Sequence, residues 1–193
     1  MVRVVVIDDH PALRAGLRTV LEAAPGIEFA GESTGDEENL WPVLNRMRPD
    51  LLLLDYHLPR ADGLQLCYRI KQTVPAPKVI LYTAYASPAL ALAATLARAD
   101  GMVAKGVPAR DLFEAIRRVD AGERVLPAIS FSAIRDAHER LEADDQAIVG
   151  MVLDGSTELE VAETLRRNPR EIRNAVQRIL STMRIEVSAA QAM

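Results

Sequence analysis

The chain has 193 residues, a net charge of −4, a pI near 5.5 and a single cysteine. This length predicts two small domains that each bury a core, and one cysteine excludes an internal disulfide framework. The overall charge gives no indication of nucleic acid as a partner. No apolar stretch is long enough for a signal peptide or a membrane span, so we expect a cytoplasmic protein without a membrane partner.

Short apolar segments alternate with amphipathic ones five times in the first 121 residues. The apolar segments predict strands at 2–7, 27–31, 51–55, 79–84 and 101–104. The segments between them predict helices that begin near residues 11, 36, 63, 88 and 108. Strands that alternate with helices in this way are typical of an α/β domain with a five-stranded parallel, doubly wound sheet.

Four of these strands end in residues that carry chemistry. Asp8 and Asp9 follow the first strand, Asp55 ends the third, Thr83 lies at the end of the fourth and Lys105 follows the fifth. Because the carboxyl ends of parallel strands meet at one edge, we expect these side chains in one crevice. Three acids there are costly unless a metal balances them, and carboxylates with open water positions suit Mg²⁺.

Each of these residues also has an ordinary structural explanation. Asp55 could be a turn residue, and Asp8 and Asp9 could cap the following helix. Thr83 could be a β-branched strand residue and Lys105 a solvated loop charge. All of these explanations must hold together for the site to vanish. No glycine-rich phosphate loop of the GxGxxG or GxxxxGK[ST] type is present, which argues against ordinary nucleotide enzymes.

The order and spacing of these residues, with Pro59 and Gly63 behind Asp55, resemble the receiver domain of bacterial two-component response regulators over residues 1–121. The resemblance implies a flavodoxin-like fold. It also implies that Asp55 accepts a phosphoryl group from a sensor histidine kinase, so the expected chemistry is self-phosphotransfer and autodephosphorylation at Asp55 and no other enzymatic activity.

The same resemblance assigns roles to the neighbouring residues. Together with the phosphoacceptor, Asp9 would bind Mg²⁺ directly, Asp8 through water, and His57 through its backbone carbonyl. Lys105 would pair with the phosphoryl oxygens as a point charge. Thr83 would donate its hydroxyl to the phosphoryl group and so move the following loop and helix.

Three further residues near the predicted site have open roles. The side chains of His57 and Tyr85 flank the pocket, where they either tune the lifetime of the phosphoryl group or serve as ordinary surface residues. His10 is expected to start a helix and not to bind metal. Met102 is a departure from the resemblance, because family members often carry an aromatic residue there that swings inward on activation; Met can fill the same gap.

The remainder of the chain predicts a partly helical linker, 122–137, and a helical domain, 138–193. Helices expected at about 144–153, 157–165 and from 169 onward resemble the LuxR-type helix-turn-helix of the NarL/FixJ regulators. This resemblance implies promoter DNA as a partner and a homodimer as the active form. Arg170, Arg173 and Asn174 would face the major groove, with Arg178 nearer to phosphate.

The charge of this second domain leaves an alternative open. From His138 onward seven arginines stand against ten acids, a net charge of −3, although five of the arginines are gathered between 166 and 178. The domain could therefore bind protein in place of DNA and act as an adaptor. A third hypothesis, an aspartate-nucleophile phosphohydrolase, requires a D-x-D spacing that Asp8-Asp9-His10 lacks.

Overall fold

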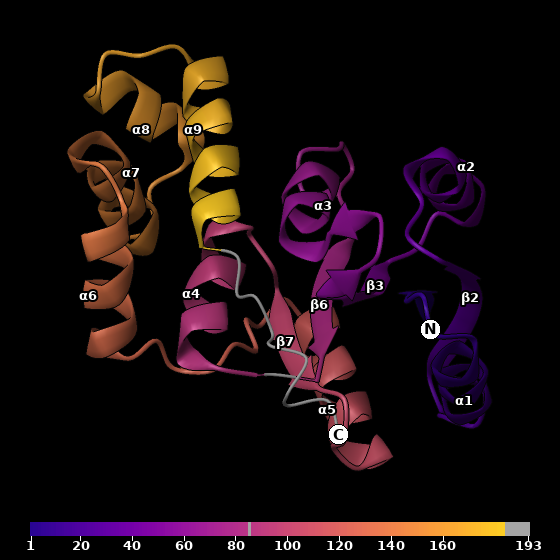
Figure 1. Cartoon of the computed structure of the whole chain (residues 1–193). Helices are drawn as coiled ribbons and strands as arrows, with labels where there is room; N and C mark the ends of the chain where they lie inside the picture. The colour runs from indigo at the N-terminus through magenta and orange to yellow at the C-terminus, as the bar shows by residue number, and fades with distance from the viewer. Residues whose placement is uncertain (85, 184–193) are drawn as a thin grey trace.

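The computed structural model describes residues 1–84 and 86–183. The main sheet consists of β1 (Val2–Ile7), β2 (Ile27–Ser33), β3 (Leu51–Asp55), β6 (Lys78–Thr83) and β7 (Gly101–Ala104). The helices between these strands are α1 (Pro11–Glu22), α2 (Glu37–Met47), α3 (Gly63–Ile70), α4 (Pro88–Leu96) and α5 (Ala109–Asp120). The helices that follow are α6 (Phe131–Arg140), α7 (Ala143–Leu153), α8 (Glu158–Thr164) and α9 (Pro169–Thr182) (Figure 1).

The sheet has the strand order β2-β1-β3-β6-β7, and every neighbouring pair is parallel. This confirms the predicted doubly wound α/β fold, to which a second, helical part is appended. Strand β2 is two residues longer than the sequence suggests. An antiparallel hairpin of β4 (His57–Leu58) and β5 (Ala61–Asp62), which the sequence analysis did not predict, lies directly after β3.

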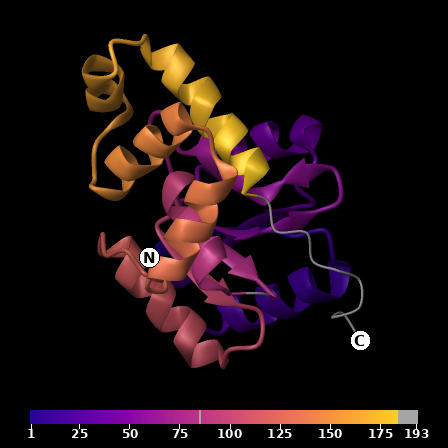
Figure 2. The same ribbon diagram turned by 60° about the vertical axis from the view of Figure 1, so that its left-hand side comes forward.

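Alternate residues of the central strands enter two different cores, as the pleat of a buried strand requires. Leu51 and Leu53 of β3 pack with residues of α1 and α5 on one face. Leu52 and Leu54 pack with residues of α2, α3 and α4 on the other. Figure 2 shows the helices on the two sides of the sheet. The four leucines are at most 1% exposed, which explains why this segment is continuously apolar.

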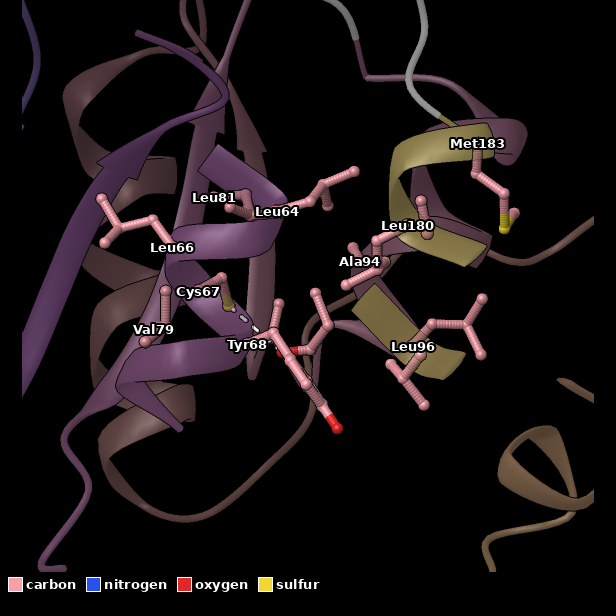
Figure 3. Close-up of a cluster of buried hydrophobic side chains, with 14 of the residues drawn as sticks. Leu64, Leu66, Cys67, Tyr68, Val79, Leu81, Ala94, Leu96, Leu180 and Met183 are labelled. Atoms are coloured by element: carbon pink, nitrogen blue, oxygen red, sulfur yellow. Dashed lines mark hydrogen bonds between the residues drawn. The ribbon is translucent and has the colours of Figure 1, made fainter. Parts of the chain in front are cut away.

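The core that lies beside α3 and α4 does not end at the first domain. It continues through α4 into α7, α8 and α9, so that the two parts of the chain share one apolar cluster. Figure 3 shows Leu64 of α3, Ala94 and Leu96 of α4, and Leu180 and Met183 at the end of α9 gathered in this cluster. The helical part is therefore docked on α3 and α4 and does not hang from a free linker.

The linker is itself attached to the edge of the sheet. Val125 donates its backbone N–H to the Asp100 carbonyl at 2.9 Å and accepts from the Met102 N–H at 2.8 Å, which makes a short parallel bridge with Gly101. Helix α6 then crosses residue 138, where the sequence places the start of the second domain. None of the helices in the described ranges has the length and apolar character that a membrane span requires.

The helical part begins its helices as the sequence predicts. Thr157 and Asn168 each form a reciprocal capping box, with Glu160 and Glu171 respectively, at the starts of α8 and α9. Gly155, with φ of +92°, supplies the left-handed backbone that the turn between α7 and α8 requires. The order helix, turn, helix, turn, helix in Figure 1 is that of the predicted helix-turn-helix.

Candidate functional site: a buried acidic cluster and a docked helical domain

The carboxyl ends of the strands bring the predicted residues together. Asp55 is 3% exposed, Asp8 1% and Thr83 0%, so these polar groups lie inside the crevice and not on its rim. Lys105 follows β7 and is anchored by its backbone N–H, which donates to the Thr83 carbonyl at 2.7 Å. The predicted convergence at one sheet edge is therefore present, and its members come from four different strands.

The ammonium group of Lys105 binds two of the acids at once. Its Nζ lies 2.7 Å from Asp8 Oδ2 and 2.7 Å from Asp55 Oδ2. The lysine side chain is 18% exposed, so the three charges are largely removed from water. A buried cation that contacts two buried carboxylates offsets much of their mutual repulsion, and removal of this cation would leave two unscreened acids.

The pKa values of Asp55 and Lys105 reflect this arrangement. Burial raises the pKa of the Asp55 carboxyl above its usual value, and the charge of Asp8 adds to the effect, against a lowering by Lys105 and by the His57 backbone. Burial alone would lower the pKa of Lys105, but its hydrogen bonds and charge interactions with Asp55 and Asp8 outweigh it, so the lysine pKa is raised. Asp55 is thus harder to ionise and Lys105 harder to neutralise than their free counterparts.

The cluster has the donor set of a site for a hard divalent cation. Oxygens of Asp8, Asp9 and Asp55 and a ring nitrogen of His10 lie within 4.8 Å of one another. Asp9 Oδ1 is buried and accepts no hydrogen bond from any described residue, although His10 Nδ1 lies 2.9 Å away. Carboxylate oxygens that face one point, one of them without a donor, fit a cation such as Mg²⁺.

The residues beside the cluster have distinct positions. His57 donates its backbone N–H to Asp55 Oδ1 at 3.2 Å, and its ring packs edge-on against Tyr56 with 4.4 Å between the ring centres. His10 begins α1, as expected, and its exposed ring lies against Asp8 and Asp9. Tyr85, the other residue predicted to flank the pocket, lies outside the described residues.

The segment after Asp55 is held by a close backbone approach. Gly63 starts α3 close to the backbone of Asp55, and a Cβ there would lie 2.4 Å from the Asp55 carbonyl oxygen and 2.7 Å from that of Tyr56. Asp62 caps α3 by accepting from Leu64 and Gln65 at 2.9 and 3.1 Å. The turn therefore needs glycine because no side chain fits between α3 and β3.

Met102 is buried on the α4 side of the sheet. It is 5% exposed and belongs to the core that continues into the helical part. Its thioether fills the place where the resemblance expects an aromatic ring, which agrees with the ability of Met to fill irregular gaps. Any switch at this position in the present chain therefore works without an aromatic ring.

The predicted DNA-contact residues divide into two groups. Arg170 and Asn174 are exposed on α9. Arg178 instead donates two hydrogen bonds to Asp145, a residue of α7 that is 5% exposed. Its Nη2 lies 2.6 Å from Asp145 Oδ1, and its Nε lies 3.2 Å from Oδ2. Arg173 is half-buried and lies 3.9 Å from a carboxylate oxygen of Glu158. Of these four residues, two are therefore engaged by acids within the fold, and the other two make no ion pair with any described residue.

One flank of α9 is covered by the first domain. Gln65 of α3 donates its amide to the Gln177 carbonyl at 2.5 Å and to Ser181 Oγ at 3.0 Å. Tyr68 of α3 donates its hydroxyl to Glu158 of α8 at 2.6 Å. These contacts add polar links to the shared apolar core, and sequence reasoning did not identify either partner.

Comparison with known proteins agrees with this fold. The model of the response regulator receiver domain matches residues 4–117. The chain is 30% identical to the DNA-binding transcriptional activator DevR/DosR of Mycobacterium tuberculosis, over 96% of this chain and 90% of that protein. It is 28% identical to the response regulator UvrY of Escherichia coli K12, over 96% and 89%.

Solved structures give the same result, and one of them matches over nearly the whole chain. RcsB from Salmonella enterica serovar Typhimurium, bound to promoter rprA in the presence of the phosphomimetic BeF3⁻, matches with a TM-score of 0.61 at 26% identity over 98% of this chain and 96% of that one. A LuxR-family response regulator from Aurantimonas sp. SI85-9A1 matches with a TM-score of 0.60 at 31% identity over 74% and 99%. The strand-end cluster and sheet define a receiver domain. The chain belongs to the two-component response regulators, in the NarL/FixJ group with a LuxR-type helix-turn-helix.

Proposed function

We propose that Asp55 accepts a phosphoryl group from a sensor histidine kinase and that phosphorylation frees α7–α9 to bind promoter DNA as a homodimer. The observation that supports this proposal best is the buried Asp55 carboxylate at the end of β3, contacted by Lys105 and faced by the Asp8–Asp9 pair. Such a partner of a sensor kinase works on the cytoplasmic side of the membrane, so we propose that location.

The proposed transfer uses the chain's own groups as follows. An Asp55 oxygen attacks phosphorus, the bond from phosphorus to the donor imidazole breaks, and the imidazole leaves with the electron pair and takes a proton from solvent. When bound by Asp9, Asp55 and the His57 carbonyl, with Asp8 acting through water, Mg²⁺ supplies charge that offsets the phosphoryl oxygens. The ammonium group of Lys105 contacts the Asp55 carboxylate before transfer, and after transfer it contacts a phosphoryl oxygen in place of that carboxylate oxygen.

The route from the site to the second domain runs through α4. Thr83, the last residue of β6, would donate its hydroxyl to the phosphoryl group and draw in the loop that leads to Ser87. Ser87 caps α4 by accepting from Leu90 at 3.1 Å, so a displaced loop moves the helix start. Helix α4 packs on α6, α7 and α9, and its displacement would disturb the whole docked surface.

The proposed DNA surface is the exposed side of α9. Arg170 and Asn174 are free to contact base edges, and Arg173 joins them once it leaves Glu158. Asp145 holds the Arg178 side chain in place, and we propose that this guanidinium group contacts a DNA phosphate. The net negative charge of the domain keeps the adaptor alternative open, whereas the likeness to a DNA-binding transcriptional activator supports DNA binding. We propose the domain division 1–121, 122–137 and 138–193, with α6 crossing its second boundary.

Phosphorylation can be tested by intact mass after incubation with acetyl phosphate and Mg²⁺. Wild type should gain one phosphoryl group, whereas Asp55→Asn should gain none. Asp111→Asn, which changes an exposed acid of α5, serves as a matched control and should react like wild type. Equal modification of Asp55→Asn would contradict the assignment of the phosphoacceptor.

DNA binding can be tested by electrophoretic shift with the protein's own promoter region at a stated salt concentration. Beryllofluoride with Mg²⁺ should raise the affinity of wild type, and Arg170→Ala should lower it in that state by about 1–3 kcal/mol. Arg135→Ala, on the exposed side of α6, is the control and should not change it. If wild type binds no DNA with or without beryllofluoride, the result favours the alternative in which the helical domain binds protein.

A further inference from the structure

The interface between the two domains contains a largely buried carboxylate whose partners lie on α3, on α9 and in the turn that follows α4. Glu158 is the first residue of α8, and its side chain is 15% exposed. Tyr68 of α3 donates its hydroxyl to Glu158 Oε1 at 2.6 Å, and Arg98, which follows α4, approaches the same oxygen at 3.8 Å. Arg173 of α9 lies 3.9 Å from Glu158 Oε2. The carboxylate thus contacts both domains.

The fold of the helical domain does not need this carboxylate. The capping box at the start of α8 is formed by Thr157 and Glu160, and it is complete without Glu158. A first-turn acid at this position would be solvated if the helical domain stood alone. Its burial is tolerated because Tyr68 and the two arginines compensate for the lost water, and two of these three groups belong to the receiver domain.

The contact with Arg173 links this cluster to the proposed DNA surface. A guanidinium group that is neutralised by a buried carboxylate is less available to the anionic surface of DNA. Arg170 and Asn174, one turn apart on the same helix, are exposed and have no such partner among the described residues. The closed arrangement therefore engages one of the proposed base-contact residues while it leaves its neighbours accessible.

We propose that Glu158 is a latch that holds the helical domain on α3 and α4 and, in the same position, competes with DNA for Arg173. This inference rests on the proposed function, because it assigns the closed state to the form that binds DNA weakly. It goes beyond that function because it assigns two roles to one acidic side chain of the helical domain. Glu158 contacts the receiver domain, and it competes with DNA for Arg173. Glu158 and Arg173 belong to the same domain, so opening of the interface does not by itself separate them. Opening exposes Glu158 to water, which screens its attraction for Arg173 and so favours the release of this arginine.

Thermodynamic linkage gives the proposal a second consequence. If DNA draws Arg173 away, Glu158 loses one of the cations that compensate for its burial at the interface. Exposure of the carboxylate by separation of the domains then becomes more favourable, and α4 becomes free to follow Thr83. Phosphorylation of Asp55 by acetyl phosphate should therefore be faster in the presence of promoter DNA than in its absence. The same acceleration should be absent in Glu158→Gln, in which the interface is already weakened.

The latch can be tested by hydrogen exchange of the full-length, unphosphorylated protein, followed by mass spectrometry of peptides from α4 and α9. Glu158→Gln should raise exchange in both helices by roughly tenfold, the change that loss of a charge-assisted hydrogen bond produces. Tyr68→Phe should do the same from the receiver side, where it cannot affect the start of α8. Glu163→Gln, an exposed acid on the same helix, is the matched control and should leave exchange unchanged.

Shift assays on the same variants separate the possible outcomes. Unphosphorylated Glu158→Gln should bind promoter DNA several-fold more tightly than wild type, and Tyr68→Phe should gain less because Arg173 keeps its acidic partner. Unchanged exchange in both Glu158→Gln and Tyr68→Phe overturns the latch, whatever DNA does. Raised exchange with no DNA binding by any form, phosphorylated wild type included, upholds the contact between the domains but contradicts the proposed function and, with it, the competition for Arg173.

Discussion

Lys105 and Asp55 come from the ends of two strands that are not neighbours in the sheet, yet 2.7 Å separates the lysine Nζ from Asp55 Oδ2. Strand β6 lies between their strands, so the lysine must reach across the end of β6 to make the contact. The same ammonium group also contacts Asp8. Lys105 therefore stabilises both the receiver fold and the ionised form of the proposed phosphoacceptor.

Phosphorylation of Asp55 should depend on pH in a way that differs from an ordinary aspartate. The reactive form is the ionised carboxylate, and burial raises its pKa above the usual 3.8. As the pH falls, Asp55 therefore becomes protonated at a higher pH than an exposed aspartate does. The rate of modification by acetyl phosphate should drop while the pH is still above 3.8. A rate series by intact mass from neutral to mildly acidic pH, with circular dichroism to confirm folding, measures this.

Replacement of Lys105 by Met should destabilise the receiver domain at neutral pH by about 2–4 kcal/mol, since it leaves two buried carboxylates without their cation. The lysine pKa is raised, so its contribution to stability is fully present below 10.5 and is lost as the pH rises through the higher folded value. The difference in urea stability between wild type and Lys105→Met should therefore narrow above pH 10.5.

Magnesium supplies an independent check on that variant. A divalent cation that binds the acidic cluster replaces part of the missing charge, so added Mg²⁺ should stabilise Lys105→Met more than wild type, in the manner of any ligand that binds the folded state. Thermal unfolding with and without Mg²⁺ measures the difference. Equal stabilisation of both proteins would show that the cation binds elsewhere.

The parallel, doubly wound sheet and the convergence of acids at its edge were predictable because both follow from local patterns. Residues 51–54 are four consecutive leucines, which predicts a buried strand, and parallel strands bring their carboxyl ends to one edge. The hairpin His57–Leu58 with Ala61–Asp62 was not predicted, because two-residue strands leave no periodic signal.

The contact between the domains escaped sequence reasoning for a different reason. Tyr68 and Glu158 are 90 positions apart, and nothing in either segment specifies the other. A hint was available in α4, whose residues Leu90–Ala94 are all at most 1% exposed: a helix that is apolar all round must be covered on every side. The receiver sheet can cover only one of these sides, so a second layer was required.

Gly63→Ala should destabilise the receiver domain strongly. Its Cβ would meet two backbone oxygens at 2.4 and 2.7 Å, and backbone cannot step aside as a flexible side chain does, so a loss of about 2–4 kcal/mol is expected. Gly16→Ala is the matched control, because a Cβ at this position of α1 meets nothing within 4 Å. It should be neutral or stabilise by about 0.5–1 kcal/mol in urea unfolding.

Arg178→Ala tests whether this arginine is structural as well as a proposed DNA contact. Its loss leaves Asp145, a 5% exposed carboxylate, without its bidentate partner. Because the arginine side chain is 58% exposed, water screens part of the effect, and we expect a loss of about 1–3 kcal/mol in the stability of the helical domain.

Arg167→Ala is the control for Arg178→Ala, since Arg167 pairs with an Asp144 side chain that is 71% exposed. An exposed pair of this kind contributes little, so its loss should change stability by no more than about 0.5–1 kcal/mol. Both variants remove one positive charge near α9, which makes their effect on nonspecific DNA attraction similar. A clear difference in urea stability, with Arg178→Ala the weaker protein, therefore reports on the buried carboxylate alone, and equal stabilities would show that Arg178 acts only at the DNA surface.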